Sequence, residues 1–155
     1  MVKAIPEGYR SITPYLIAKG ASDAIEFYKR AFGATEDMRL PKPDGSIAHA
    51  ELSIGDSKIM LADEFPEMGY RSPLSIGGTG VSMMLYIENV DEVFKRAIAA
   101  GAKELLPIKD QFYGDRSGTL QDPFGHVWTI ATHTEDVPPE EMERRVEQFT
   151  RQSGK

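Results

Sequence analysis

One segment of this chain occurs twice, and this duplication constrains the fold more than any other feature. Residues 23–36 read DAIEFYKRAFGATE and residues 91–104 read DEVFKRAIAAGAKE, so Asp23 and Gly33 recur as Asp91 and Gly101, each 68 residues later. Each copy has an Asp at a plausible helix N-cap, apolar residues at helical spacing and a Gly just past the end. An N-cap residue, helical spacing and a terminating glycine that all recur at the same offset predict two copies of one structural unit.

Strand-like runs surround each predicted helix in the same order. Residues 12–18 and 81–87 precede the helices; residues 35–40, 47–54 and 58–63 follow the first helix, and residues 104–107, 118–121 and 127–132 follow the second. We therefore expect an α+β fold of tandem βαβββ modules over 10–64 and 80–133. Residues 65–79 contain Pro66, Pro73 and several glycines, which predict a linker that runs over the surface.

Residues 138–152 predict a separate C-terminal helix. Pro139 suits a first helical position, and the glutamates that follow it complement the partial positive charge of a helix N-terminus. The apolar positions form one narrow stripe, made of Met142, Val146 and Phe149. Such a stripe predicts a surface helix that packs on its own domain or on a second subunit.

Length, charge and cysteine content restrict the class of protein. With 155 residues and 41% apolar residues, the chain can bury a core as one domain over 1–155. A net charge of −6 argues against a nucleic-acid partner, and no apolar run reaches the roughly 18 residues of a membrane span. The start MVKAIPEGYR lacks the apolar core of a signal peptide, which predicts a cytoplasmic protein. The absence of cysteine excludes disulfides and thiolate chemistry.

Two stretches carry a resemblance to a known family. Residues 114–133 read GDRSGTLQDPFGHVWTIATH, in which Asp122-Pro123-Phe124-Gly125 predicts a tight turn between two strands, and residues 49–64 read HAELSIGDSKIMLADE. Together they resemble the PhnB-like branch of the vicinal-oxygen-chelate superfamily, which holds glyoxalase I, extradiol dioxygenases and the bleomycin- and fosfomycin-resistance proteins. The resemblance implies paired βαβββ modules around a cleft for a small molecule.

The resemblance also locates the positions at which metal-dependent members hold a divalent ion. These members place His, Glu or Gln on the first and last strand of each module, and the corresponding positions here fall near Thr13, Val81, Met60 and Thr129. None of these side chains is the imidazole or carboxylate that such an ion requires. A small alignment shift would add only Asp63 as a good ligand. We therefore expect no metal cofactor, which argues against glyoxalase and dioxygenase activity.

Alternation along residues 47–54 places one polar pair on the predicted cleft. Ala48, Ala50, Leu52 and Ile54 should pack on the helix, so the alternate residues Ile47, His49, Glu51 and Ser53 should face the cleft. His49 and Glu51 could act as a general base and its orienting partner, or supply two ligands to a metal. The pattern slightly favours a structural explanation, in which the two residues are a hydrogen-bonded polar pair in a wet cleft or Glu51 lies at a solvated edge.

Other residues are weaker candidates for the cleft. Arg116 could clamp an anionic group, although an arginine on a strand edge usually faces solvent, and Phe112 and Tyr113 could form a pocket wall or pack locally. We expect Trp128 in the core, and His126 and His133 in turns or surface hydrogen bonds. The remaining predicted cleft-lining residues are Tyr15, Met60, Met83 and Thr129, with Val81 and Leu85.

Three functions are compatible with these features. The first is a metal-free small-molecule binder, with its ligand in an apolar cleft between modules. The second is an enzyme of the lyase, isomerase or dioxygenase type that uses His49 and Glu51, with or without a metal at a non-standard position. The third is an interaction protein whose fold serves dimerisation alone. Exposed strand edges and an uncovered sheet face favour a homodimer in each case.

Overall fold

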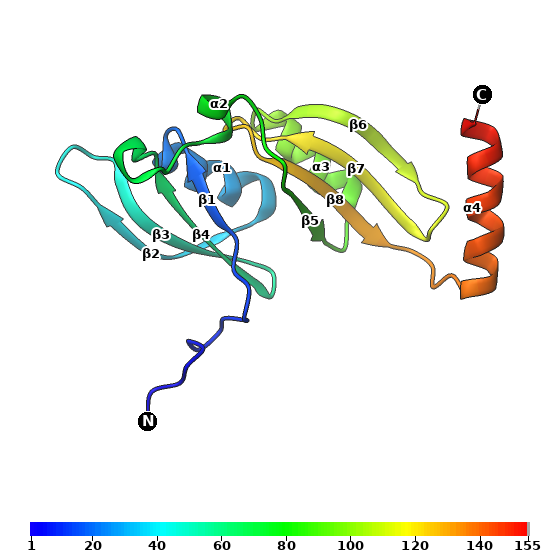
Figure 1. The fold of residues 1–155 in the computed structure, drawn as a ribbon, viewed down its shortest axis with the longest axis horizontal. Helices are drawn as coiled ribbons and strands as arrows, with labels where there is room; N and C mark the ends of the chain where they lie inside the picture. Colours follow the sequence, from blue (N-terminus) through cyan, green and yellow to red (C-terminus); the bar gives the residue numbers. More distant parts are fainter. Residues whose placement is uncertain (155) are drawn as a thin grey trace.

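The computed structural model describes residues 1–154 and contains two βαβββ modules in succession (Figure 1). The first module comprises β1 (Tyr15–Ala18), α1 (Ala21–Phe32), β2 (Thr35–Pro41), β3 (Ile47–Ile54) and β4 (Ser57–Asp63). The second comprises β5 (Ser82–Tyr86), α3 (Val90–Ala99), β6 (Lys103–Asp110), β7 (Asp115–Gln121) and β8 (Val127–His133). Between them lie η1 (Pro66–Met68) and α2 (Pro73–Ile76), and α4 (Pro139–Ser153) ends the chain. The predicted α+β class with tandem modules and a C-terminal helix is confirmed.

Each module forms one four-stranded sheet, and the two sheets have the same strand order. The orders are β1-β4-β3-β2 and β5-β8-β7-β6, so the first strand of each module lies at an edge and pairs in parallel with the last strand. The other neighbouring strands are antiparallel. The repeat found in the sequence is therefore a repeat of strand topology as well.

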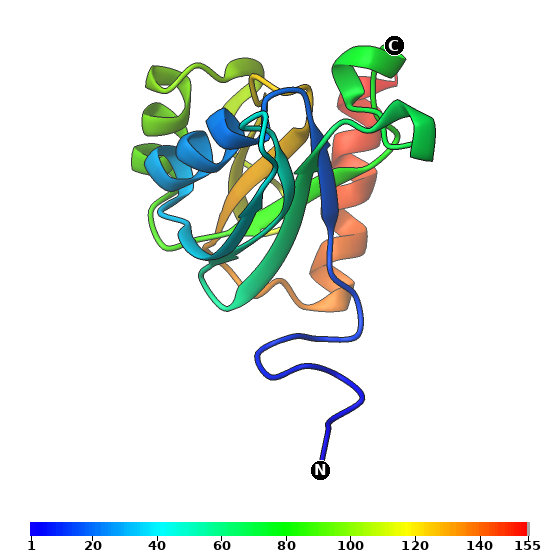
Figure 2. The same ribbon diagram turned by 90° about the vertical axis from the view of Figure 1, so that its left-hand side faces the viewer.

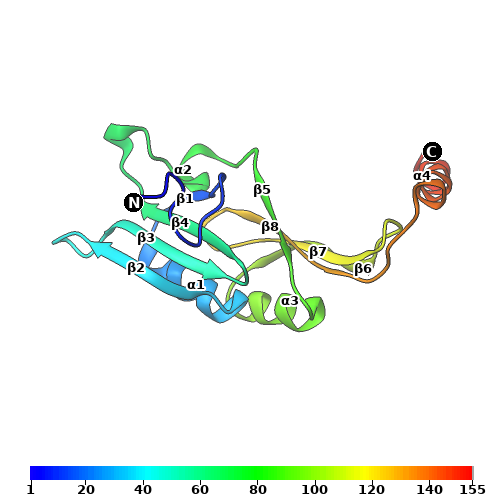
Figure 3. The ribbon, with the colours of Figure 1, turned by 90° about the horizontal axis from the view of Figure 1, so that it is seen from below.

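Helices α1 and α3 cover the same side of the molecule and contact each other (Figures 2 and 3). Helix α1 begins three residues and α3 two residues before the predicted starts, because neither Asp23 nor Asp91 is the N-cap. Gly20 precedes α1, and the carboxylate of Asp63 accepts hydrogen bonds from the Gly20 and Ala21 amides. A cap supplied by the end of β4 leaves no local sequence signal. In α3 the cap is Asn89, whose side chain accepts from the Glu92 amide.

Some strand boundaries also differ from those predicted. β1 begins three residues late, at Tyr15, because Pro14 has no amide hydrogen to donate. β6 and β7 are longer than the predicted runs, since pairing with each other extends both into polar sequence. The segment predicted as a linker contains η1 and α2.

The carboxylate of Asp122, in the turn between β7 and β8, is the polar centre of the core. Its side chain is buried and accepts from the Trp128 indole at 2.9 Å and from the Tyr28 hydroxyl of α1 at 2.5 Å. The amides of Phe124 and His126 donate to its other oxygen at 2.9 and 3.0 Å. Because Tyr28 belongs to the first module, these bonds join the two modules inside one chain.

Aromatic packing and one histidine reinforce this junction. Trp128 lies against Phe32 of α1 with ring centroids 4.8 Å apart, which confirms its predicted place in the core. His126 was expected in a turn or surface hydrogen bond, but it is buried, and its Nε2 lies 2.9 Å from the Ile17 carbonyl of β1. The His126 backbone closes the turn with Asp122, as predicted, but the bond of its ring was not predicted, because the partner comes from the other module.

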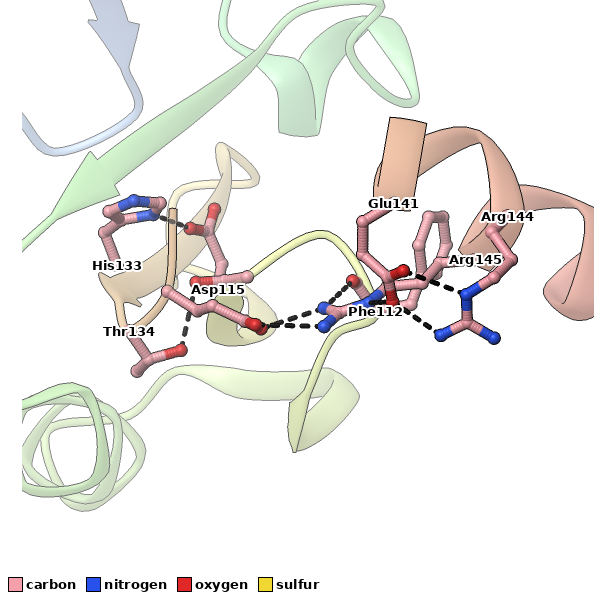
Figure 4. A network of polar contacts seen from close by, with 9 residues as sticks. Phe112, Asp115, His133, Thr134, Glu141, Arg144 and Arg145 are labelled. Carbon is pink, nitrogen blue, oxygen red and sulfur yellow. Dashed lines mark hydrogen bonds and ion pairs between the residues drawn. The ribbon is translucent and has the colours of Figure 1, made fainter. Parts of the chain in front are cut away.

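Helix α4 lies beyond the end of the second sheet and is held by one arginine and one aromatic contact (Figures 1 and 4). Arg145 binds the Glu135 carboxylate and the Phe112 carbonyl, and the Phe149 ring packs on the Phe112 ring at 4.9 Å. Val146 and Phe149 nevertheless stay 43% and 45% exposed, so the predicted apolar stripe is only partly covered. None of the described helices is long and apolar enough to cross a membrane.

We predict that Asp122→Ala lowers the free energy of unfolding by about 3 kcal/mol, because the buried Tyr28 hydroxyl and Trp128 indole lose their acceptor. Urea denaturation followed by circular dichroism measures the change. The exposed Asp56→Ala serves as the control and should stay within about 0.5 kcal/mol of the unsubstituted protein. Equal stabilities of the two variants would contradict the central role of Asp122.

Candidate functional site

Each sheet has one face covered by its helix and one open face, and β3 places its polar pair on the open face. Ala50, Leu52 and Ile54 are buried against the core as predicted, while His49 and Glu51 point the other way. The alternation fails at the start of the strand, where Ile47 is buried and Ala48 is exposed. The register with β2 shifts between Leu40 and Pro41, and this bulge reverses the faces that the sequence pattern predicted for both residues.

Four side chains form a continuous hydrogen-bonded chain on the open face of the first sheet. The Tyr15 hydroxyl lies 2.8 Å from His49 Nδ1, and His49 Nε2 lies 2.9 Å from the Glu51 carboxylate. The other oxygen of Glu51 accepts from the Tyr9 hydroxyl. The structure thus brings together three predicted site residues and adds Tyr9. No strand pattern could have revealed Tyr9, because it lies in the irregular N-terminal segment.

The protonation states of these four hydrogen-bonded side chains follow from their geometry. Hydrogen bonds from Tyr9 and His49 lower the pKa of Glu51, so this side chain is a carboxylate at neutral pH. Burial and the bond to Glu51 raise the pKa of Tyr9, and burial beside Tyr70 and Glu51 raises the pKa of Tyr15. With a carboxylate at Nε2 and a neutral phenol at Nδ1, the matching tautomer carries its proton on Nε2 and accepts the Tyr15 proton at Nδ1.

A hollow of about 180 Å³ lies between the modules. It is bounded by the segment before β1, by the turn between β3 and β4, and by β5. Its lining is mostly apolar and includes the predicted residues Met83 and Leu85, together with Met84, Ile54, Ile59 and Trp128. Arg10 and Lys58 supply its basic groups. Met60, also predicted to line the cleft, instead lies beside Tyr15 and Glu51 on the open face.

A second groove, of about 330 Å³, lies on the open face of the second sheet. The predicted residues Tyr113 and Thr129 line it, with Met84 and Leu106. Thr129 shares a hydrogen bond of 2.8 Å with Thr119. Phe112 is absent from this lining and packs on Phe149 of α4.

Arg116 lies outside both cavities. Its guanidinium binds both oxygens of Asp91 on α3, at 2.9 and 2.8 Å, and approaches Asp110 at 3.3 Å. These carboxylates raise its pKa further above the neutral range. Because the guanidinium points to the helix side and is already paired, the geometry does not support the anion clamp that the sequence suggested. Asp115, the preceding residue of β7, points to the opposite face of the sheet.

Asp115 and His133 form a polar pair on the open face that the sequence pattern did not single out (Figure 4). The buried Asp115 carboxylate accepts from the Tyr86 hydroxyl at 2.7 Å and lies 2.8 Å from His133 Nδ1. His133 Nε2 lies 2.7 Å from Asp136. The two carboxylates raise the pKa of His133, with Asp115 the stronger cause. The cross-strand register of Asp115 with His133 creates the pair, and this register is not visible in the sequence.

The positions that would hold a divalent metal do not fit one. Thr13 and Val81 lie before β1 and β5, and Met60 and Thr129 carry a thioether and a hydroxyl that is bonded to Thr119. Asp63, the possible extra ligand, accepts from three backbone amides, those of Gly20, Ala21 and Ile47. Residues 1–154 contain no cluster of three or more His, Asp or Glu side chains suited to a metal.

Comparisons with known proteins agree with this architecture. The uncharacterized protein Rv0887c of Mycobacterium tuberculosis is 41% identical over 136 residues, which cover 86% of this chain and 80% of that protein. Among solved structures, protein PA1353 from Pseudomonas aeruginosa superposes with a TM-score of 0.67 at 26% identity, over 81% of this chain and 99% of that one.

The PhnB protein from Bacillus cereus has a TM-score of 0.63 at 21% identity, over 79% of this chain and 99% of that one, which shows a shared fold. Residues 12–130 match the family described as the Glyoxalase/Bleomycin resistance protein/Dioxygenase superfamily. The match covers most of both modules, from the segment before β1 to β8. This chain belongs to that superfamily.

Proposed function

We propose that the protein binds a small organic molecule in the hollow between its two modules and does so without a metal. The observation that carries this proposal is the apolar lining of a cavity built from both modules. A cavity of about 150 Å³ is large enough for benzene. The hollow is slightly larger, and the flexible thioethers of Met83 and Met84 allow it to adapt to a larger ring system.

The basic side chains Arg10 and Lys58, beside the single carboxylate of Asp56, line the hollow and favour an anionic group on the ligand. Lys58 already binds Asp37 at 2.9 Å, whereas Arg10 is exposed in the segment that forms one wall. A guanidinium binds carboxylates and sulfonates through planar, two-point hydrogen bonds. The proposed ligand class is therefore a flat apolar molecule that carries one anionic group.

We further propose that the protein forms a homodimer through the open face of the second sheet. Met84 and Leu106 on this face are 51% and 61% exposed, which is unfavourable for a face directed to water. β5, which carries Met84, is an edge strand, with one side of its backbone unpaired within the sheet. A second copy of the chain would cover the apolar side chains and offer hydrogen-bond partners to the unpaired backbone groups of β5.

An enzyme that uses His49 and Glu51 is the second candidate function. One observation favours it: the imidazole and the carboxylate lie 2.9 Å apart on an open sheet face, as a general base and its orienting partner require. An interaction protein without a ligand has less support, because the hollow between the modules is not filled by side chains.

To test the ligand site, we would titrate the protein with 2-naphthoate and follow binding by calorimetry and by the fluorescence of Trp128, the sole tryptophan. We expect Arg10→Glu to weaken binding by about fivefold or more, because an attractive charge becomes repulsive. Arg30→Glu, an exposed position on α1, makes the same change of charge elsewhere and should leave the affinity unchanged. Equal affinities of the two variants, or no binding at all, would refute the site.

The metal-free character is tested by thermal-shift titration with Ni²⁺, Mn²⁺, Fe²⁺ and Zn²⁺. We expect the melting temperature to stay constant, because the family's ligand positions hold no imidazole or carboxylate. A rise that disappears in His49→Ala would show that a metal binds at a non-standard site and would overturn this part of the proposal.

The dimer is tested by sedimentation velocity at micromolar concentration. We expect a particle of twice the chain mass of 17.2 kDa, and a single-chain mass for the double variant Met84→Lys, Leu106→Lys. Ile98→Lys, at a partly exposed position on α3, is the control and should remain dimeric. A single-chain mass for the unsubstituted protein would contradict the proposal.

A further inference from the structure

The hydroxyl of Tyr15 ends the hydrogen-bonded chain on the first sheet, and ligand binding in the hollow does not use it. Tyr15 is 46% exposed on the open face, so its oxygen is within reach of a molecule from solution. Behind it, His49 Nδ1 lies 2.8 Å away and is itself held by Glu51 through Nε2. Tyr9 fixes the far oxygen of Glu51. A hydroxyl, an imidazole and a carboxylate thus lie in hydrogen-bonded order.

We propose that Tyr15, His49 and Glu51 form a proton-transfer triad in which the Tyr15 hydroxyl is the group that meets the substrate. This inference rests on the second candidate function and is independent of ligand binding in the hollow. The order is that of an activated hydroxyl: reacting oxygen, base, and a third group that orients the base. Tyr15 is then the catalytic residue, while Glu51 and Tyr9 position His49.

The proton moves in one balanced step. A substrate X–H bond breaks and leaves its electron pair on X, while the proton binds the Tyr15 oxygen. At the same time the Tyr15 proton passes to Nδ1 of His49, which already carries a proton on Nε2. The products are the substrate anion and an imidazolium, whose positive charge lies 2.9 Å from the Glu51 carboxylate. No oxidant, reductant or metal takes part.

The surroundings of Tyr15 indicate what kind of molecule can approach. Met60 is its register partner on β4, and Met38 lies across from Glu51 on β2. The hydroxyl of Tyr70 is close enough to contribute to the raised pKa of Tyr15. An apolar floor beside one reactive hydroxyl fits a substrate with an apolar body and a weakly acidic hydrogen, either a hydroxyl or a C–H next to a carbonyl.

The inference can be tested without knowing the substrate. An arylsulfonyl fluoride modifies a tyrosine when the phenol oxygen bonds to sulfur, the S–F bond breaks, fluoride leaves and a base takes the phenol proton. In this triad the base is His49. The labelled protein is digested, and mass spectrometry of the peptides measures labelling at each tyrosine. Tyr70, which is 50% exposed, is a matched control within the same molecule.

We expect Tyr15 to be labelled at least about tenfold faster than Tyr70, because an adjacent base activates a hydroxyl. The ratio should fall to about one in His49→Leu, and to an intermediate value in Glu51→Gln, which keeps the shape of the side chain but loses its charge. Unfolding would accelerate both tyrosines together, whereas lost activation slows Tyr15 and leaves Tyr70 unchanged, so the absolute rate at Tyr70 separates lost activation from lost structure. Equal labelling in the unsubstituted protein, or an unchanged ratio in His49→Leu, would overturn the triad.

The same samples separate this inference from the proposed binding function. If 2-naphthoate binds with its dependence on Arg10 while Tyr15 shows no enhanced labelling, only the triad fails. If Tyr15 is activated and 2-naphthoate does not bind, the hollow is not the ligand site and the triad stands.

Discussion

The relative position of the two modules depends on a buried carboxylate. Asp122 receives hydrogen bonds from the Tyr28 hydroxyl of one module and from the Trp128 indole of the other. A buried carboxylate without donors would be strongly destabilising, so these bonds fix α1 against the turn before β8. Trp128 also lines the hollow between the modules. The interaction that joins the modules therefore shapes the proposed ligand site as well.

The open faces of the sheets carry the chemistry that the core does not. On the first sheet, Tyr15, His49 and Glu51 form one hydrogen-bonded chain; on the second, Asp115 binds Tyr86 and His133. Membership in the superfamily shows the scaffold, but one scaffold supports many reactions, and function must be argued from the site. Here the side chains of Thr13, Val81, Met60 and Thr129 offer a divalent metal no imidazole or carboxylate.

The sequence predicted features that arise from local patterns and missed those that arise from long-range contacts. The duplicated helix was sufficient to predict two modules with the same order of elements. Alternation along the third strand was sufficient to predict that His49 and Glu51 lie on the same face. The start of α1 was wrong because Asp63 caps it from another strand, and that of α3 because Asn89 is the cap in place of Asp91. Ile47 and Ala48 exchanged faces at a bulge. Arg116 on β7 binds Asp91 on α3, and Tyr9 in the irregular N-terminal segment donates a hydrogen bond to Glu51. Such pairings are decided by tertiary packing.

The most direct test of the account is where a ligand lies. Nuclear Overhauser effects between 2-naphthoate protons and ¹³C-labelled methionine methyl groups would locate it, because the methionines are distributed over different surfaces. Met83 lines the hollow, Met84 lines both the hollow and the groove on the second sheet, Met60 marks the open face of the first sheet, and Met142 lies on α4. The account predicts effects to Met83 together with Met84. Effects confined to Met60 or Met142 would contradict a ligand site between the modules.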